Sequence, residues 1–135
     1  MSAITRSTVS IRFSGKNLNP EQLTLLLGCL PTETGNTGEE IVTKSGNLRK
    51  VTKGFWHLEY GDSDEVDLGE KVNLLLGKLT NDLTTWRQVT HEFKAGVFCG
   101  LFMDNMNEGF TLSPDLLRKL ADRQIEIGID IYSPA

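Results

Sequence analysis

Cysteine and histidine are scarce in this sequence, which has two of each among its 135 residues. Cys29 and Cys99 do not make a disulfide framework, and the apolar residues beside them predict small buried side chains. His57 and His91 are far apart in the chain, and neither a His-x-x-x-His nor a Cys-x-x-Cys pair is present. We therefore predict neither a metal site nor a cofactor.

Long apolar runs and an excess of positive charge are also missing. No stretch reaches the roughly 18 apolar residues that a membrane-spanning helix needs, so we expect no membrane partner. Residues 1–8 carry no apolar segment of the signal-peptide type, which predicts a cytoplasmic protein. The net charge of −4 argues against a nucleic acid partner, because such binding depends on neutralising phosphates.

Motifs of enzyme active sites are absent too. There is no Gly-x-Ser-x-Gly nucleophile elbow, and Gly77-Lys78-Leu79-Thr80 lacks the upstream glycines of a phosphate-binding loop. A pairing of Cys99 with a histidine is the nucleophilic arrangement that the sequence leaves open. We predict that the protein is not an enzyme and has no catalytic residues.

A helix-start signature, in contrast, occurs twice. Leu18-Asn19-Pro20-Glu21 and Leu112-Ser113-Pro114-Asp115 each place an N-cap residue before a proline, whose fixed φ suits the first helical position. Gly28 is expected to end the first of these helices. The apolar faces of the two helices are predicted to consist of Leu23, Leu26, Leu27 and Leu30, and of Leu116, Leu117, Leu120 and Ala121.

Four stretches have the patterns of β-strands. Residues 9–13, 55–60 and 125–132 alternate between apolar and polar, and Trp56, Leu58 and Tyr60 are expected to point inward. Residues 97–103 are nearly all apolar, which predicts a central strand covered on both faces. The pattern fades between residues 32 and 53, where we predict a loop over 34–40 and a hairpin formed by 41–44 and 48–52.

The longest helix is expected between residues 63 and 83. Ser63 is its predicted N-cap, and Gly77 inside it indicates a point of close packing. Trp86 and Val89 suggest that a helical turn or two continues beyond it. The apolar residues at helical spacing are Val72, Leu75, Leu76, Leu79 and Leu83.

Taken together, the elements have the order β-α-(ββ)-β-α-β-α-β in one domain over residues 1–135. The second helix-start signature, like the first, follows a strand, so the chain contains a pseudo-repeat. We predict an α+β fold, a two-layer sandwich of a mostly antiparallel sheet with helices on one face. A ferredoxin-like arrangement is the nearest named pattern.

The distribution of these motifs resembles the uncharacterised bacterial domain-of-unknown-function 4279 family over nearly the whole chain. That resemblance implies no settled activity and supplies no catalytic residues, and small bacterial domains of this kind often act as immunity proteins beside secreted toxins. The chain departs from the family pattern at residues 122–124, where a glycine is expected after the last helix. The matching segments are residues 9–15, 18–20, 27–32, 38–39, 54–58 and 112–132.

One candidate binding surface is the polar face of the last strand. Glu126, Asp130 and Tyr132 lie on that face, and His57 and Glu59 lie on the corresponding face of an earlier strand. Glu126 and Asp130 are about 13 Å apart along a strand, too far for direct cooperation, although Glu59 could join either across strands. The face is either an ordinary solvated surface or the recognition surface for a ligand.

Two clusters of charge are further candidates. Lys44, Arg49 and Lys50 surround the predicted hairpin, where they form either a solvated surface or a site for an anion or an acidic partner. An acidic run before the long helix either stabilises the helix N-terminus or meets a basic partner such as a toxin nuclease. The candidate partner-binding residues are Asp62, Asp64, Glu65 and Asp67, with Trp86 as the expected exposed anchor.

These observations favour a non-catalytic protein-binding domain, with an immunity protein that neutralises a cognate toxin as its specific form. The alternative is a small-ligand or nucleotide-binding domain that uses the polar strand face and the basic hairpin. A homodimer built on a sheet face or edge is a third hypothesis.

Overall fold

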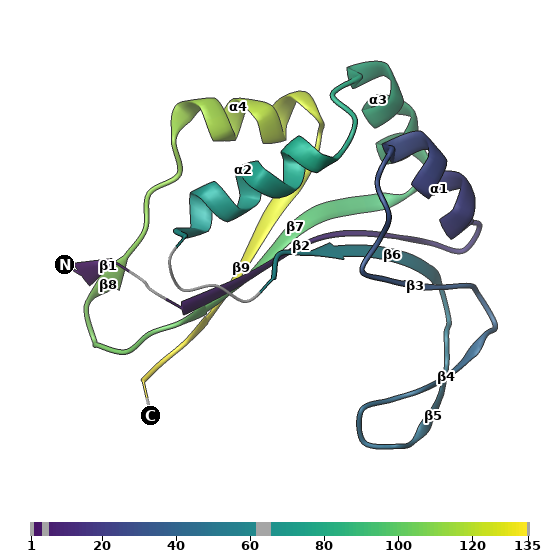
Figure 1. The fold of residues 1–135 in the computed structure, drawn as a ribbon, viewed down its shortest axis with the longest axis horizontal. Coiled ribbons are helices and arrows are strands. Elements are labelled where there is room, and N and C mark those ends of the chain that lie inside the picture. Colours follow the sequence, from purple (N-terminus) through teal and green to yellow (C-terminus); the bar gives the residue numbers. More distant parts are fainter. Residues whose placement is uncertain (1, 4–5, 62–65, 135) are drawn as a thin grey trace.

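A computed structural model describes residues 2–3, 6–61 and 66–134 of the chain. Helices lie on one side of a twisted sheet, and a hairpin projects beyond the sheet on the opposite side (Figure 1). The helices are α1 (Pro20–Leu27), α2 (Leu68–Lys78), α3 (Leu83–Glu92) and α4 (Pro114–Asp122). The strands are β1 (Ser2–Ala3), β2 (Arg6–Gly15), β3 (Glu33–Gly35), β4 (Glu40–Val42), β5 (Leu48–Lys50), β6 (Gly54–Glu59), β7 (Lys94–Phe102), β8 (Glu108–Gly109) and β9 (Glu126–Tyr132).

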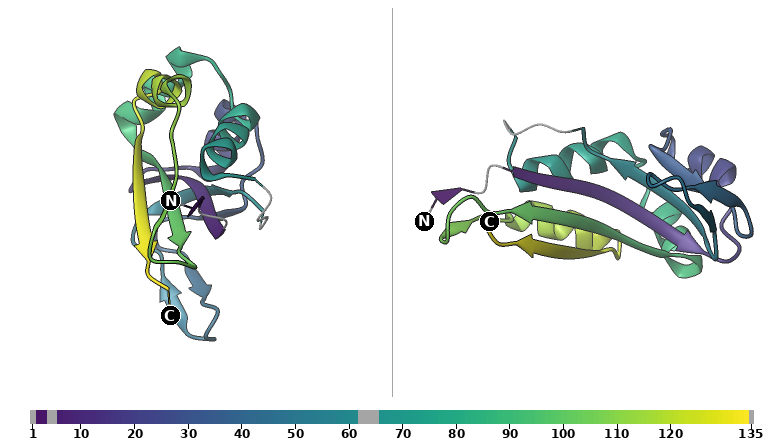
Figure 2. Two further views of the ribbon diagram at one scale, coloured as in Figure 1. Left: turned by 90° about the vertical axis from the view of Figure 1, so that its left-hand side faces the viewer. Right: turned by 90° about the horizontal axis from the view of Figure 1, so that it is seen from below.

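The main sheet has five strands in the order β3-β6-β2-β7-β9. Its pairs are antiparallel except for β7 and β9, which run parallel and are joined through α4. The two views in Figure 2 show the helices stacked over one face of this sheet. The predicted α+β fold, with a mostly antiparallel sheet and helices on one face, is confirmed.

The pseudo-repeat is also present as two strand–helix–strand units. The units are β2–α1–β6 and β7–α4–β9, with α2 and α3 between them. Their geometry differs, because β2 and β6 are antiparallel and β3–β5 follow α1, whereas β7 and β9 are parallel. In both units the predicted cap starts the helix: Asn19 Oδ1 accepts from the backbone N–H of Gln22 at 3.2 Å, and Ser113 Oγ accepts from that of Leu116 at 3.1 Å. Gly28 ends α1 with φ 72°, a left-handed conformation that glycine adopts without strain.

The predicted apolar stripes are only partly buried. Leu23 and Leu27 of α1 and Leu116 and Leu120 of α4 are in the core. Leu30 is 79% exposed, because α1 ends at Leu27 and the chain turns away before it. Leu117 and Ala121 of α4 are likewise exposed, since they lie on the side of the helix that the sheet does not reach.

The predicted long helix is interrupted. Leu79 ends α2, and a separate helix, α3, begins at Leu83 behind the Asp82 cap. The cap of α2 in the described residues is Asp67, which accepts from Glu70 N at 2.8 Å, whereas Ser63 lies outside them. Gly77 does not mark close packing, because a Cβ at this position would meet no atom within 4 Å.

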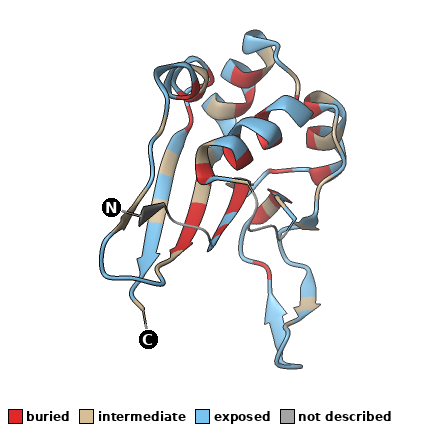
Figure 3. Ribbon diagram, turned by 60° about the vertical axis from the view of Figure 1, so that its left-hand side comes forward, coloured by how far each residue is buried: buried red, intermediate tan, exposed pale blue. Residues whose placement is uncertain are grey.

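Two tryptophans and a phenylalanine lie in the core. Figure 3 shows that buried residues of the helices and of the strands face one another between the two layers. The Phe13 ring packs edge-on against Trp56 at 5.5 Å, and it lies tilted by 32° against Trp86 at 5.8 Å. Both tryptophans are 0% exposed, and Trp86 Nε1 donates to the Thr80 carbonyl oxygen at 2.7 Å. Trp56 is therefore buried as predicted, but the prediction of Trp86 as an exposed anchor was wrong.

The segment between α1 and β6 is more ordered than predicted. Residues 33–35, partly assigned to a loop, form strand β3 and pair with β6. The predicted hairpin is present as β4 and β5, joined by a turn at residues 43–47. Leu48 and Val42 are exposed at 72% and 69%, so the hairpin is held by its own pairing and not by a core.

Candidate functional site

The face of the sheet that no helix covers carries most of the polar groups that sequence analysis singled out. The register places Arg12 of β2 opposite His57 of β6 on one side and Gly96 of β7 on the other. Gly96 in turn lies opposite Glu126 of β9. Because residues opposite one another share a face, this row crosses four strands on the open side of the sheet.

A hollow of about 290 Å³ lies over this row. It exists because Gly96 and Gly128 have no side chains to fill the space between Arg12 and Glu126. The ionisable side chains that line it are Arg12, His57, Lys94 and Glu126.

Arg12 is held by an aromatic ring beneath it. Its Cζ lies 4.2 Å from the centroid of Phe98, and its Nε donates to Ser10 Oγ at 2.9 Å. In the described part of the chain, no acceptor is bonded to its terminal guanidinium nitrogens. The guanidinium is therefore oriented, exposed and free to bind an anion in a bidentate manner.

A second stacked arginine lies toward the other end of the same face. Arg6 Cζ is 5.2 Å from the ring centroid of Phe102, and this ring stacks on Tyr132 at 4.9 Å with 10° between the planes. A larger hollow of about 640 Å³ extends over this region. Its lining includes the exposed polar residues Arg6, Thr8, Arg12, Thr32 and Glu59.

His57 is half-buried in the first hollow, with its ring 4.8 Å from Phe55. Burial lowers the pKa of His57 below its ordinary value of 6.5, the Arg12 charge lowers it further, and Glu59 partly opposes both. The imidazole therefore favours the neutral form, which can donate and accept hydrogen bonds but adds no charge to the hollow.

Cys99 is not placed to act as a nucleophile. Burial raises the pKa of the Cys99 thiol to about 12, and its side chain lies in the core on the helix side of the sheet. His57 lies on the opposite side, so these two residues do not form a nucleophile–base pair. Within the described residues no group of three or more His, Cys, Asp or Glu side chains is arranged to hold a metal ion.

Five of the residues predicted to form a polar strand face lie on the open face of the sheet. His57 and Glu126 line the smaller hollow and Glu59 lines the larger one. Asp130 and Tyr132 continue the face along β9. Glu59 does not join Glu126 or Asp130, however, because β2 and β7 separate it from β9, a distance of about 14 Å by strand spacing.

The charged clusters are placed differently. Lys44, Arg49 and Lys50 are exposed on the β4–β5 hairpin, which projects on the open side of the sheet, and they line neither hollow (Figure 1). Asp67 caps α2. Asp62, Asp64 and Glu65 lie outside the described residues.

The two stacked arginines and the rings below them are not among the candidate residues predicted from the sequence. The prediction of residues 97–103 as a strand covered on both faces was wrong, because Phe98 and Phe102 are half-buried on the open face. The signal was the alternation of Gly96, Phe98, Gly100 and Phe102. Glycine inside a strand often marks a site where a ligand or another backbone approaches closely.

Comparison with known protein families shows the family to which the chain belongs. Residues 4–134 match the family described as Domain of unknown function (DUF4279). The chain belongs to the DUF4279 family. No curated protein and no solved structure matches it.

In the part of the chain that the structure describes, no helix is long and apolar enough to span a membrane.

Proposed function

We propose that this DUF4279 domain is a non-catalytic binding module that holds a protein partner on the open face of its sheet. The observation that carries the proposal is the pair of arginines stacked on phenylalanine rings, Arg12 on Phe98 and Arg6 on Phe102. Arginine is, with tryptophan and tyrosine, one of the residues that most often dominate binding energy at protein interfaces. Stacking restricts both guanidinium groups before binding, which reduces the entropy lost on association.

The two oriented guanidinium groups favour an acidic segment of the partner. Arg6, Arg12 and Lys94 lie on the open face, and the basic hairpin projects on the same side. A partner carboxylate can accept two parallel hydrogen bonds from a guanidinium. Glu59 of β6 and Glu126 of β9 lie on either side of the arginines. Both repel partner carboxylates that are not aligned with the guanidinium groups, which fixes the orientation of the partner.

The position of Cys99 in the core on the helix side, away from His57 on the open face, supports a non-catalytic role. The specific form that the family resemblance suggests is an immunity protein that neutralises a cognate bacterial toxin. In that form the acidic segment belongs to the toxin, and binding blocks its activity.

The experiment is a binding titration between this chain and the product of its neighbouring gene, by calorimetry and by co-purification. We expect Arg6→Gln and Arg12→Gln each to weaken binding about tenfold or more, because each removes a charge-assisted contact. Arg118→Gln is the matched control, since Arg118 is exposed on α4, on the helix side. Unchanged affinity in both face variants, or equal loss in the control, would contradict the proposal.

The immunity form has its own test. Co-expression should rescue cells from the neighbouring gene product, and the Arg6→Gln, Arg12→Gln double variant should lose the rescue while remaining folded. Binding without rescue contradicts the immunity form and leaves the binding module standing.

A small acidic ligand is the second candidate, favoured by the convergence of Arg12, Lys94 and His57 on one hollow. Thermal-shift titration with carboxylate and phosphate metabolites tests it, because a bound ligand raises stability with concentration. Lys94→Gln and Arg12→Gln should abolish the shift. A flat response across a broad collection of such compounds would exclude this candidate.

A further inference from the structure

Strand β9 presents a free edge. It is the outermost strand of the sheet, and no element lies beside its outer edge in the right-hand view of Figure 2. The carbonyl of Tyr132 accepts from Met103 N at 3.0 Å, so even-numbered residues of β9 direct their backbone groups toward β7. By alternation, the N–H and C=O groups of Ile127, Ile129 and Ile131 point outward, and no backbone bond to them occurs among the described residues.

This edge lacks the usual protection against pairing. β9 is seven residues long and contains no proline. Its charged residues, Glu126 and Asp130, face the open side of the sheet, not its edge. An unprotected edge of this kind is a template for another strand.

We propose that β9 pairs antiparallel with β9 of a second copy of this chain, with Ile129 at the two-fold axis. In this register Ile127 faces the second copy's Ile131, and Ile129 faces its own counterpart. All three pairs then consist of outward-pointing residues, which exchange N–H···O bonds in both directions. The two five-stranded sheets become one continuous sheet with all helices on one face.

The charges select this register over its neighbours. With Ile129 on the axis, Gly128 faces the second copy's Asp130 and Glu126 faces its Tyr132, so no like charges are opposed. A shift by one hydrogen-bonded step in one direction places Glu126 opposite the second copy's Asp130. The same shift in the other direction places the Asp130 side chains of the two copies opposite one another. Like charges directly opposite one another destabilise a strand pair.

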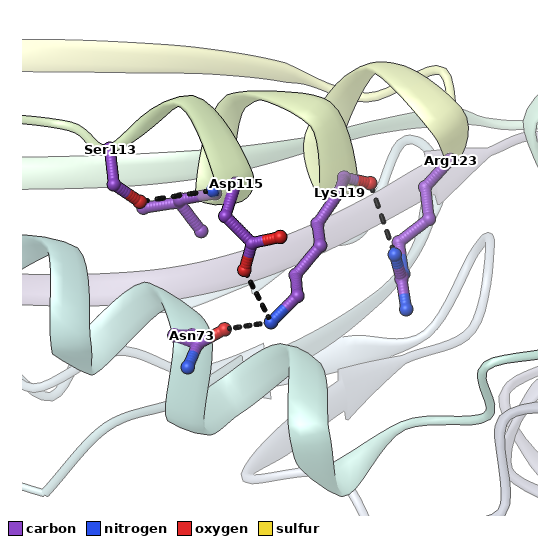
Figure 4. Close-up of polar contacts among 6 residues, drawn as sticks. Asn73, Ser113, Asp115, Lys119 and Arg123 are labelled. Carbon is purple, nitrogen blue, oxygen red and sulfur yellow. Dashed lines mark hydrogen bonds and ion pairs between the residues drawn. The ribbon is translucent and has the colours of Figure 1, made fainter.

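The outer side of α4 provides a second, independent observation. Lys119 Nζ donates to Asn73 Oδ1 of α2 at 2.8 Å and pairs with Asp115 at 3.3 Å, which fixes the side of α4 that faces α2 (Figure 4). Leu117 is two residues from Lys119, or about 200° around the helix, and so lies on the opposite side, above the β9 edge. It is 47% exposed, and Ile131 of β9 is 60% exposed. A second copy would cover both.

The matched test uses Gly128, where a Cβ would meet no atom within 4 Å in a single copy. Gly128→Asp places a carboxylate opposite the second copy's Asp130, whereas Gly128→Lys places an ammonium there. Each dimer contains this pair twice. We therefore expect the dissociation constant of the dimer to rise about tenfold for Gly128→Asp and to fall about tenfold for Gly128→Lys. Sedimentation velocity across a concentration series measures both.

Ile129→Pro tests the backbone pairing. It removes an N–H that faces solvent in the single copy, so the circular dichroism spectrum should stay native while the dimer is lost. Leu117→Glu should also weaken the dimer. A wild-type chain that remains monomeric up to millimolar concentration, or a dimer indifferent to Ile129→Pro and to the charge at position 128, would overturn the proposal. Because no partner protein is present, the result does not depend on the function proposed above.

Discussion

Lys71 Nζ lies 2.7 Å from the backbone carbonyl oxygen of Ser7 and 3.0 Å from its hydroxyl, although the two residues are 64 positions apart. Lys71 is 1% exposed and Ser7 is 7% exposed. The contact ties α2 to the part of β2 that extends beyond its pairing with β6. The ammonium thus satisfies a buried edge carbonyl that no neighbouring strand reaches.

Replacing this lysine tests the contact. Lys71→Met keeps the apolar stem but leaves the Ser7 carbonyl and hydroxyl without their donor, so the free energy of unfolding should fall by about 1–3 kcal/mol. Lys78→Met, at an exposed position in the last turn of α2, is the control and should change it by less than about 0.5 kcal/mol. Urea unfolding measures both, and equal effects would show that the Ser7 contact is not responsible.

The end of α4 offers a stabilising substitution. Gln124 has φ 58°, the only described non-glycine residue with a positive φ, and it lies in the segment 122–124 where we expected a glycine. Gln124→Gly removes the steric cost of a side chain in this conformation and should raise the free energy of unfolding by about 1 kcal/mol. Gln124→Ala keeps a Cβ and should give no such gain. A destabilised glycine variant would show that the glutamine side chain makes a compensating contribution.

Local features of the fold could be predicted from the sequence because their causes are local. The caps at Asn19 and Ser113 depend on neighbouring backbone groups, and the alternation in residues 125–132 follows from strand geometry. The break between α2 and α3 could not be predicted in this way. Leu79 and Leu83 continue the helical period, and the Asp82 cap that separates the helices competes with that pattern.

The candidate site was only half predictable for a related reason. Alternation shows that His57 and Glu126 face one side of their own strands, but not which strands are neighbours. The rows that place Arg12 between them depend on pairing between distant segments. The burial of Trp86 likewise depends on Phe13 and Thr80, which are brought to it by packing and by the turn before α3.

Fluorescence should verify the position of both tryptophans. Because Trp56 and Trp86 are fully buried, the native protein should emit at short wavelength and resist quenching by acrylamide. Trp86→Phe should also cost more stability than Trp56→Phe. The first leaves the Thr80 carbonyl without its donor, whereas the second leaves the Thr24 hydroxyl, which still donates to the Pro20 carbonyl. Strong quenching of the Trp86 signal in a Trp56→Phe variant would place that ring at the surface.

The titration of His57 reports on the electrostatics of the smaller hollow. Burial is the main cause of its lowered pKa, and the charges of Arg12 and Glu59 act in opposite directions. We expect Arg12→Gln to raise the pKa of His57 toward 6.5 and Glu59→Gln to lower it further. His91→Gln leaves a single imidazole, whose NMR signal can be followed in each variant. Shifts in the same direction for both variants would show that the charges do not act directly on the ring.

The same shift makes stability depend on pH. The folded protein binds the His57 proton less readily than the unfolded chain, so protonation favours unfolding. This contribution to stability is fully present above the ordinary pKa of 6.5 and is lost as the pH falls from 6.5 toward the lower folded-state pKa. His57→Gln should therefore flatten the decline in urea midpoint over that window, while His91→Gln serves as the matched control. If the decline in urea midpoint is unchanged in the His57 variant, the carboxylates cause the decline. An acidic ligand bound at Arg12 should raise the pKa of His57 and so narrow the pH range over which stability is lost.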